Sequence, residues 1–155
     1  MRIYLIAVGS RLDGWVYQGY EEFAKRLPPD CALHLIEIPA LKRGKNADIE
    51  RITREEGRKV LAAIPKGAKV IALDVQGPQH STQALARKLD AWLQGGQDVA
   101  LLVGGPEGLA DDCLACAQEK WSLSKLTLPH PLVRIVVAEQ IYRAWSILNH
   151  HPYHR

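Results

Sequence analysis

Four short apolar runs, separated by longer segments of helix-forming residues, constrain the fold of this chain most strongly. The runs are rich in Val, Ile and Leu and are bounded by Gly, Pro or Asp. Their apolar character is nearly continuous instead of alternating, which is typical of parallel strands covered by helices on both faces. The sequence therefore predicts an α/β fold with a mostly parallel sheet. The predicted strands are "RIYLIAVG" at 2–9, "CALHLIEI" at 31–38, "KVIALDV" at 69–75 and "DVALLV" at 98–103.

The segments between the strands are long enough for helices of three or four turns. The second of them has Asp48 near its start and Pro65 just after its end, which are a capping residue and a helix-stopping residue. No linker, repeat or low-complexity segment interrupts the pattern. We therefore expect one domain, residues 1–155, with helices at 12–27, 47–64 and 81–94.

The overall composition is that of a globular chain without a membrane span. Hydrophobic residues make up 47% of the 155 residues, which is enough for a core, and no apolar run approaches the length needed to cross a bilayer. The N-terminus lacks the features of a secretory signal, so we expect a cytoplasmic protein with three reduced cysteines. A net charge of +3 permits a polyanionic partner without requiring one.

The last predicted helix, "PLVRIVVAEQIYRAWSILN", departs from the ordinary surface pattern. It opens with Pro131, which suits a first helical turn, and its apolar residues surround most of its circumference. Such a helix must be buried on more than one side, either in the centre of a larger core or between this sheet and a second copy of the protein. Because the chain is short, we favour a dimer.

A glycine-rich turn follows the fourth strand in "LLVGGPEGLADD". Glycines at the carboxyl end of a strand let a ligand approach the backbone, and open parallel sheets bind ligands at that edge. Gly104, Gly105 and Gly108 do not form the dinucleotide-binding pattern, and the chain contains no phosphate-binding loop of the P-loop type. From these residues alone, a ligand site and a tight turn that merely needs glycine are equally supported.

Several separated motifs together resemble one known family. They are "IPALKRGKNADI", "ALDVQG", "LLVGGPEGL", "WSLSKLTLPHPLVRIVVAEQIYRAW" and "NHHPYHR", and they cover the whole chain in order. They are similar to the RlmH family of SPOUT RNA methyltransferases. The resemblance implies methylation, with S-adenosylmethionine as the cofactor, of N3 of a pseudouridine in helix 69 of large-subunit ribosomal RNA within the ribosome. It also implies a homodimer and a deep trefoil knot near the C-terminus, and no metal.

The same resemblance implies where the cofactor binds. Backbone groups at strand ends and in loops would bind the adenine edge, leucine side chains would enclose the ring, and glycine would make room for the cofactor. The implied positions are Leu73, Gly104, Leu123, Ser124, Lys125, Leu126, Thr127 and Leu128.

Resemblance and chemistry together favour Arg143, Tyr153 and His154 as catalytic residues. Methyl transfer to a ring nitrogen requires in-line approach and loss of the N3 proton. We expect Arg143 to stabilise the developing anion or hold a phosphate, and Tyr153 and His154 to bracket the base or relay its proton.

The stretch "LKRGKN" supplies candidates for binding RNA. Lys42, Arg43 and Lys45 surround Gly44 in a predicted loop, where cations can follow phosphates. Taken alone, such a cluster is more often a solvated basic loop. With the family resemblance, we expect it to contact RNA.

Four further residues near these motifs could be taken for functional residues, but we expect structural roles for them. We expect Glu107 to be a turn or cap carboxylate and His130 to be a loop histidine hydrogen-bonded to backbone. Cys113 and Cys116 have C-x-x-C spacing, but no second pair accompanies them and acidic neighbours disfavour a thiolate, so we interpret them as small helix residues. The terminal histidines lack the spacing of a metal site.

Two other functions stay open from the sequence. One is a non-catalytic ribosome-binding protein that uses the same basic loop. The other is a SPOUT methyltransferase that acts on a different RNA. Because one small domain offers little surface to identify a single hairpin, we expect ribosomal protein or the second subunit to complete the recognition surface.

Overall fold

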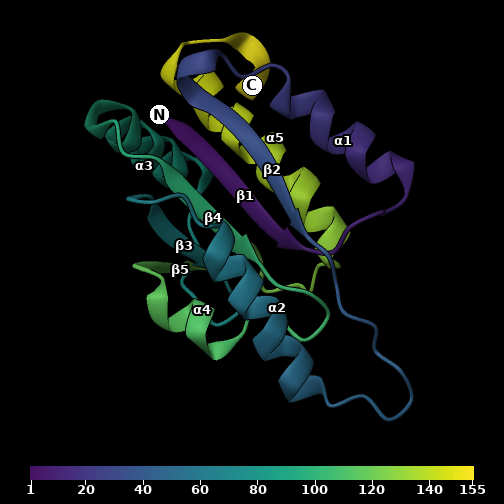
Figure 1. Ribbon diagram of the computed structural model, residues 1–155. Helices are drawn as coiled ribbons and strands as arrows, with labels where there is room; N and C mark the ends of the chain where they lie inside the picture. The colour runs from purple at the N-terminus through teal and green to yellow at the C-terminus, as the bar shows by residue number, and fades with distance from the viewer.

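Five parallel strands form a single sheet in the order β2-β1-β4-β3-β5 (Figure 1). The structure is a computed structural model that describes residues 1–155. The predicted α/β class and parallel sheet are confirmed, and the four predicted strands lie within a residue or two of their expected positions. The strands are β1 (Arg2–Val8), β2 (Ala32–Ile38), β3 (Lys69–Leu73), β4 (Val99–Val103) and β5 (Glu119–Trp121).

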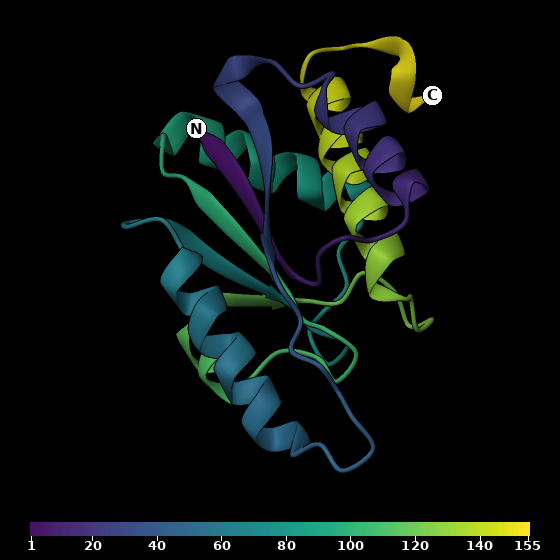
Figure 2. The ribbon, with the colours of Figure 1, turned by 45° about the vertical axis from the view of Figure 1, so that its right-hand side comes forward.

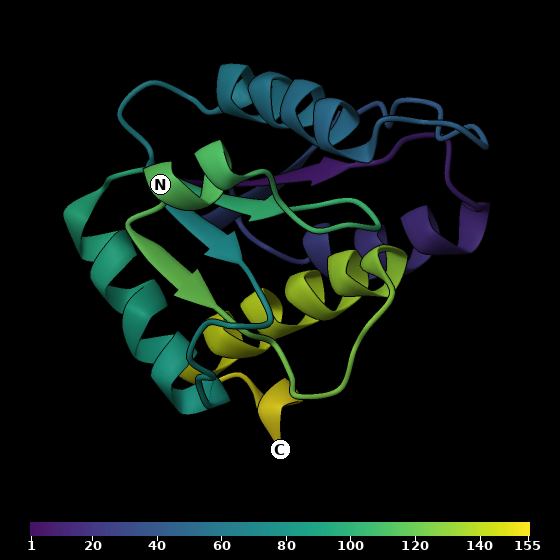
Figure 3. The same cartoon turned by 90° about the horizontal axis from the view of Figure 1, so that it is seen from below.

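Helices cover both faces of the sheet, as Figure 3 shows. Helix α5 packs between α1 and α3 on one face, while α2 and α4 pack together on the other. No helix is both long and apolar enough to cross a bilayer. The helices are α1 (Gly14–Ala24), α2 (Ile49–Ala63), α3 (Thr82–Gly95), α4 (Asp111–Cys116) and α5 (His130–Leu148), with short 3-10 turns at η1 (Pro29–Cys31) and η2 (Pro152–His154).

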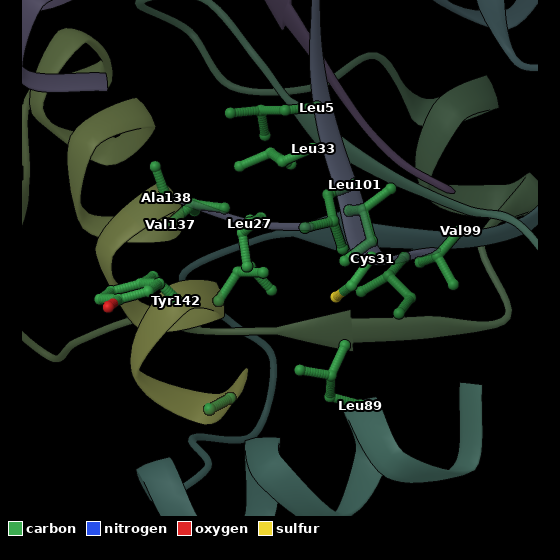
Figure 4. Close-up of a cluster of buried hydrophobic side chains, with 14 of the residues drawn as sticks. Leu5, Leu27, Cys31, Leu33, Leu89, Val99, Leu101, Val137, Ala138 and Tyr142 are labelled. Carbon is green, nitrogen blue, oxygen red and sulfur yellow. The ribbon is translucent and has the colours of Figure 1, made fainter. Parts of the chain in front are cut away.

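The core has two parts because successive strand residues point to opposite faces. Leu5 and Leu101 belong to the larger cluster of 20 buried residues under α5 (Figure 4), whereas Ile6 and Leu102 belong to a cluster of 10 that faces α2. All five residues of β4 are buried. This explains the continuous apolar runs, since a central strand must satisfy both clusters.

Local signals in the sequence set the helix boundaries. The side chain of Asp48 accepts a hydrogen bond from the amide of Arg51 at the start of α2, and Ser81 caps α3 through the amide of Ala84. Helix α3 ends at Gly96, whose φ of 73° is left-handed and suits glycine. The predicted helix starts and stops are confirmed to within three residues.

Strand β5 was not predicted, because two of its three residues, Glu119 and Lys120, are charged. Its charge is compensated by tertiary contacts: Glu119 forms ion pairs with Lys69 at 2.6 Å and with Lys88 at 2.8 Å. The indole of Trp121 stacks on that of Trp92, with ring centroids 5.8 Å apart. These partners are distant in sequence, so a local pattern cannot reveal the strand.

Helix α5 packs against α1 and α3 within one chain. Helix α1 approaches it closely at Gly19, where a Cβ atom would lie 2.6 Å from Cδ1 of Ile135. The guanidinium of Arg134 is completely buried and donates to Glu37 at 2.6 Å and to the carbonyl of Gly9 at 2.8 Å. Among the large apolar residues of α5, Val137, Ile141 and Tyr142 are buried, most others are only half-buried, and Leu132 is 37% exposed. Burial in one core therefore explains part of the helix, and the dimer stays a prediction.

Candidate functional site

A cavity of about 500 Å³ opens where the carboxyl ends of β3, β4 and β5 meet the beginning of α5. Figure 2 shows the loops that follow these strands gathered at one end of the sheet. The cavity is lined from segments 73–75, 103–109 and 121–130, with Val133 on α5 as its innermost helical residue. Its volume and its position at the carboxyl edge are those of a small-molecule site in an α/β fold.

The cavity brings together seven of the eight residues predicted to bind the cofactor. Lys125 is the exception, because it is exposed and lies outside the lining. The seven lining residues are Leu73, Gly104, Leu123, Ser124, Leu126, Thr127 and Leu128.

The backbone of segment 123–128 is largely free to bind a ligand. Within it, only the amide of Leu126 donates to another protein group, the hydroxyl of Ser124 at 2.9 Å. Only the carbonyl of Ser124 accepts, from the hydroxyl of Ser122 at 3.0 Å. The other amides and carbonyls have no protein partner, and unpaired backbone groups beside a cavity can recognise the polar edge of a heterocycle.

Gly104 lines the cavity, and the fold of its loop also requires glycine at this position. A Cβ atom at Gly104 would lie 2.3 Å from the carbonyl carbon of Gly108, because the loop folds back on itself through a bridge between Gly105 and Gly108. Gly108 has a φ of +84°, which disfavours other residues. The tight-turn interpretation is therefore confirmed, and the turn forms one wall of the cavity.

An arginine and two glutamates join this turn to the basic loop. Arg43 pairs with Glu56 at 2.7 Å and with Glu107 at 2.8 Å, and it lowers the pKa of the Glu107 carboxyl mainly through hydrogen bonding. Glu107 lies in the turn, as predicted, and its carboxylate is in addition paired with a side chain 64 residues away. Lys42 and Lys45, by contrast, are exposed and form no ion pair.

His130 is the first residue of α5 and lines the cavity. Its Nδ1 atom is buried without a hydrogen-bond partner, so the interpretation as a loop histidine bonded to backbone was wrong. Burial, together with the charges of Arg134 and Arg43, lowers the pKa of its imidazole below the ordinary value of 6.5. The ring that faces the cavity is therefore neutral near pH 7.

Two of the predicted catalytic residues, Arg143 and Tyr153, meet at Glu139. The carboxylate oxygen Oε1 of Glu139 accepts from Nε of Arg143 at 2.7 Å and from the hydroxyl of Tyr153 at 3.0 Å. The Arg143 guanidinium also lies over the Tyr153 ring, 5.0 Å from its centroid. Burial and the hydrogen bond to Glu139 raise the pKa of Tyr153, so the phenol stays protonated and acts as a donor.

His154 is held by the buried hydroxyl of Ser146, which lies 2.8 Å from its Nδ1 atom. The hydroxyl proton of Ser146 is donated to the carbonyl of His151 at 3.0 Å. Because a hydroxyl carries a single proton, Nδ1 of His154 must be the donor, and the lone pair of Nε2 is left available.

Glu139, Ser146 and Arg26 also belong to this C-terminal cluster and were not predicted from the sequence. Arg26 lies over the rings of Tyr142 and Tyr153, at 5.4 and 5.9 Å from their centroids. The i,i+4 spacing of Glu139 and Arg143 is a signal that was present in the sequence. The contacts of Arg26 and Ser146 depend on the tertiary fold and leave no such trace.

The two groups of predicted site residues lie at opposite ends of α5. None of Arg143, Tyr153 and His154 lines the cavity. Arg143 lies ten residues beyond Val133, which is about 15 Å along a helix axis. In Figure 2 the C-terminal segment folds back at the end of α5 that is remote from the loops. Within one chain, the structure therefore does not bring the cavity and the catalytic candidates together.

The C-x-x-C pair has the character of structural cysteines. Burial raises the pKa of Cys113 to about 11 and also raises the pKa of Cys116, so neither favours a reactive thiolate. The Cys113 thiol points to the carbonyl of Gly57 at 3.5 Å. No cluster of three potential metal ligands is present. The interpretation as helix residues is confirmed by their place in α4.

Comparison with known proteins identifies relatives along the whole chain. A family model described as "Predicted SPOUT methyltransferase" matches residues 1–154. The chain is 61% identical over 155 residues to "Ribosomal RNA large subunit methyltransferase H" of Thioalkalivibrio sulfidiphilus, a match that covers 100% of this chain and 99% of the relative.

Solved structures support the fold alone, because their sequences are distant. A probable methylase family protein from Haemophilus influenzae superposes with a TM-score of 0.61 at 13% identity, over 97% of this chain and 69% of that one. TrmJ from Z. mobilis superposes with a TM-score of 0.55 at 18% identity, over 92% and 70%.

Proposed function

This chain belongs to the SPOUT methyltransferase family, and we propose that it methylates N3 of a pseudouridine in helix 69 of large-subunit ribosomal RNA. The observation that carries the proposal is the cavity at the carboxyl edge, where seven residues implied by the family resemblance meet. The curated relative, 61% identical over its whole length, supports ribosomal RNA as the substrate.

The residues of the cavity fit S-adenosylmethionine. Free backbone amides and carbonyls of segment 123–128 are suited to the adenine edge, and Leu73, Leu123 and Leu128 offer apolar walls for the ring. When bound, S-adenosylmethionine supplies an electrophilic methyl group. The turn Gly104–Gly108 forms one wall and limits the access of water from that side.

The terminal cluster supplies groups that the substrate base requires. Removal of the N3 proton leaves negative charge on the pyrimidine ring, and a guanidinium such as that of Arg143 stabilises an anion at short range. The ring of Tyr153 can pack against the base, because its single O–H is donated to Glu139. Nε2 of His154 can take up the proton, because its Nδ1 atom is already committed to Ser146.

We further propose that the functional unit is a homodimer in which the terminal cluster of one copy completes the cavity of the other. The separation of about 15 Å along α5 argues against a complete site within one chain. The five exposed large apolar residues all follow the carboxyl ends of strands, at the edge where the cavity opens, as expected for a contact surface. They are Trp15, Ile49, Val75, Leu126 and Leu132.

Recognition of RNA is assigned to the exposed lysines of the basic loop. Lys42 and Lys45 have free ammonium groups close in sequence to Arg43, which reaches the cavity wall through Glu107. Exposed lysines on a loop can follow phosphates without a fixed direction. The proposed substrate is the assembled ribosome in the cytoplasm, where ribosomal protein or the second subunit adds recognition surface.

The test is transfer of labelled methyl from S-adenosylmethionine to ribosomes that lack the modification, with and without prior conversion of the uridine to pseudouridine. Label on N3 of the helix 69 pseudouridine, absent when the uridine is unconverted, is the expected result. If the protein bound the cofactor and methylated another RNA but not ribosomes, the proposed substrate would be wrong. Absence of both binding and transfer would favour a non-catalytic ribosome-binding role.

A further inference from the structure

We propose that Arg43 is a positioning residue for the cavity: it holds the turn Gly104–Gly108 in place and thereby sets the affinity for S-adenosylmethionine. This inference rests on the proposed function. It separates Arg43 from its neighbours Lys42 and Lys45, which are exposed on the same loop.

The hydrogen-bonding groups of Arg43 are used inside the protein. Its Nη1 and Nη2 atoms donate to the two carboxylate oxygens of Glu56, at 2.8 and 2.7 Å. Its Nε and Nη2 atoms donate to Glu107 at 3.0 and 2.8 Å, and Nη1 also donates to the carbonyl of Leu41 at 2.9 Å. A guanidinium with all three nitrogens occupied is poorly placed to bind a phosphate.

The contact with the turn includes its backbone. A Cβ atom added at Gly105 would lie 3.5 Å from Nη2 of Arg43 and 3.2 Å from Cγ1 of Val8, so these two side chains lie next to the turn and leave little room beyond its backbone. No other side-chain hydrogen bond joins residues 104–109 to the rest of the chain than the one between Arg43 and Glu107. Because Glu107 lines the cavity, the position of Arg43 fixes that wall.

The identity of the side chain matters because one planar group must bridge two carboxylates. Glu56 is only 3% exposed and also accepts from the amide of Leu41 at 2.8 Å, so it anchors Arg43 to the protein interior. The outer edge of the guanidinium then reaches Glu107. A lysine keeps the charge but lacks the fork geometry, so it cannot hold both carboxylates with the same contacts.

The experiment compares cofactor binding of Arg43→Lys with that of the wild type by titration calorimetry with S-adenosylmethionine, without RNA. We expect Kd to rise on the order of tenfold, since a small displacement of a cavity wall weakens binding. The matched control is Arg51→Lys, which makes the same change in an exposed ion pair with Glu55 and should leave Kd unchanged. Melting temperatures identify any loss of folded protein.

A double-variant cycle distinguishes positioning from general destabilisation. If Arg43 acts through Glu107, the variant Arg43→Lys with Glu107→Gln should bind no more weakly than the weaker single variant. A folded Arg43→Lys variant with wild-type affinity would overturn the inference, as would effects that multiply in the double variant. Should Arg43→Lys not fold, wild-type affinity of Glu107→Gln would overturn it equally. A wild-type chain that binds no cofactor would instead overturn the proposed function.

Discussion

The two ends of helix α5 differ in how completely their polar groups are satisfied. At the N-terminal end, around His130, a cavity of about 500 Å³ is lined by unpaired backbone groups and a neutral imidazole without a partner for Nδ1. At the C-terminal end, Arg143, Tyr153 and His154 already have partners in Glu139 and Ser146. One end is prepared to receive a ligand, and the other is a preorganised set of side chains with no cavity of its own.

This contrast supports the proposal that one chain carries two halves of a site. Preorganised charged groups contribute to catalysis only where charge develops in a reaction, and the cavity holds seven of the residues predicted to bind the methyl donor. A twofold axis that sets two α5 helices antiparallel would bring each C-terminal cluster to the other copy's cavity. The predictions below change one half at a time.

The largest effect is expected from Arg143→Ala. Loss of the guanidinium removes a charge that stabilises the developing anion, so turnover on ribosomes should fall by roughly 10²–10³-fold. Cofactor affinity should change far less than turnover, because the groups proposed to bind the cofactor belong to segment 123–128 and the turn Gly104–Gly108. Single-turnover methyl transfer and calorimetry measure the two quantities separately. Unchanged turnover of a folded dimer would remove the C-terminal cluster from the mechanism.

Gly104→Ala should produce the opposite pattern at the other end of α5. The new methyl group would lie 2.3 Å from the backbone of Gly108, so the turn must move, and we expect cofactor affinity to fall about tenfold or more. The control is Gly95→Ala, where a Cβ atom meets nothing within 4 Å. Wild-type affinity of the Gly104 variant would show that the turn does not shape the site.

A smaller effect is expected when the exposed lysines of the basic loop are neutralised. Lys42→Gln with Lys45→Gln should raise KM for ribosomes about tenfold, with a reduced salt dependence, because fewer counterions are released on binding. The cofactor Kd should not change. The matched double variant, Lys59→Gln with Lys66→Gln, removes two exposed lysines elsewhere and should behave as the wild type. If both double variants raised KM equally, the effect would come from the net charge of the protein and not from a contact of Lys42 and Lys45 with RNA.

The smallest effect concerns stability away from both ends of α5. Burial would raise the pKa of Glu119, but hydrogen bonds from Lys69, Lys88 and Trp121 outweigh it and lower the pKa to about 2. Its ionised form therefore stabilises the fold above about pH 4.5, and this contribution is lost as the pH falls towards 2.

Glu119→Gln should accordingly cost about 1 kcal/mol at pH 7, because the carboxylate is partly solvated, and the cost should shrink as the pH falls through about 2. Urea unfolding across this range is the measurement. If the loss of unfolding free energy did not depend on pH, it would come from the packing of the side chain and not from its charge.

Most of the fold could be predicted from the sequence, because its strongest signals are local. Buried parallel strands require continuous apolar runs, and Asp48, Ser81 and Gly96 mark helix ends through contacts within a few residues. Strand β5 escaped prediction because its charged residues are neutralised by distant lysines. The knot, implied by resemblance, has no local signature and stays a prediction.

The candidate site divides in the same way. The residues that line the cavity were predicted through family resemblance, and seven of the eight are found there. The pairing of Arg43 with Glu107 could not be predicted, because the two residues are 64 positions apart and each has an ordinary local interpretation. Separation of the cavity from the C-terminal cluster likewise follows from the length of α5 and from the way the tail folds back.

The most direct test of the account is activity of a heterodimer that combines Gly104→Ala in one copy with Arg143→Ala in the other, purified through two different tags. With S-adenosylmethionine kept below the wild-type Kd, each homodimer should be at least about tenfold less active than the wild type. The heterodimer contains one site with an intact cavity and an intact C-terminal cluster from the other copy, so we predict about half the wild-type rate of methyl transfer to ribosomes. A heterodimer no more active than the two homodimers would contradict a site shared between two chains.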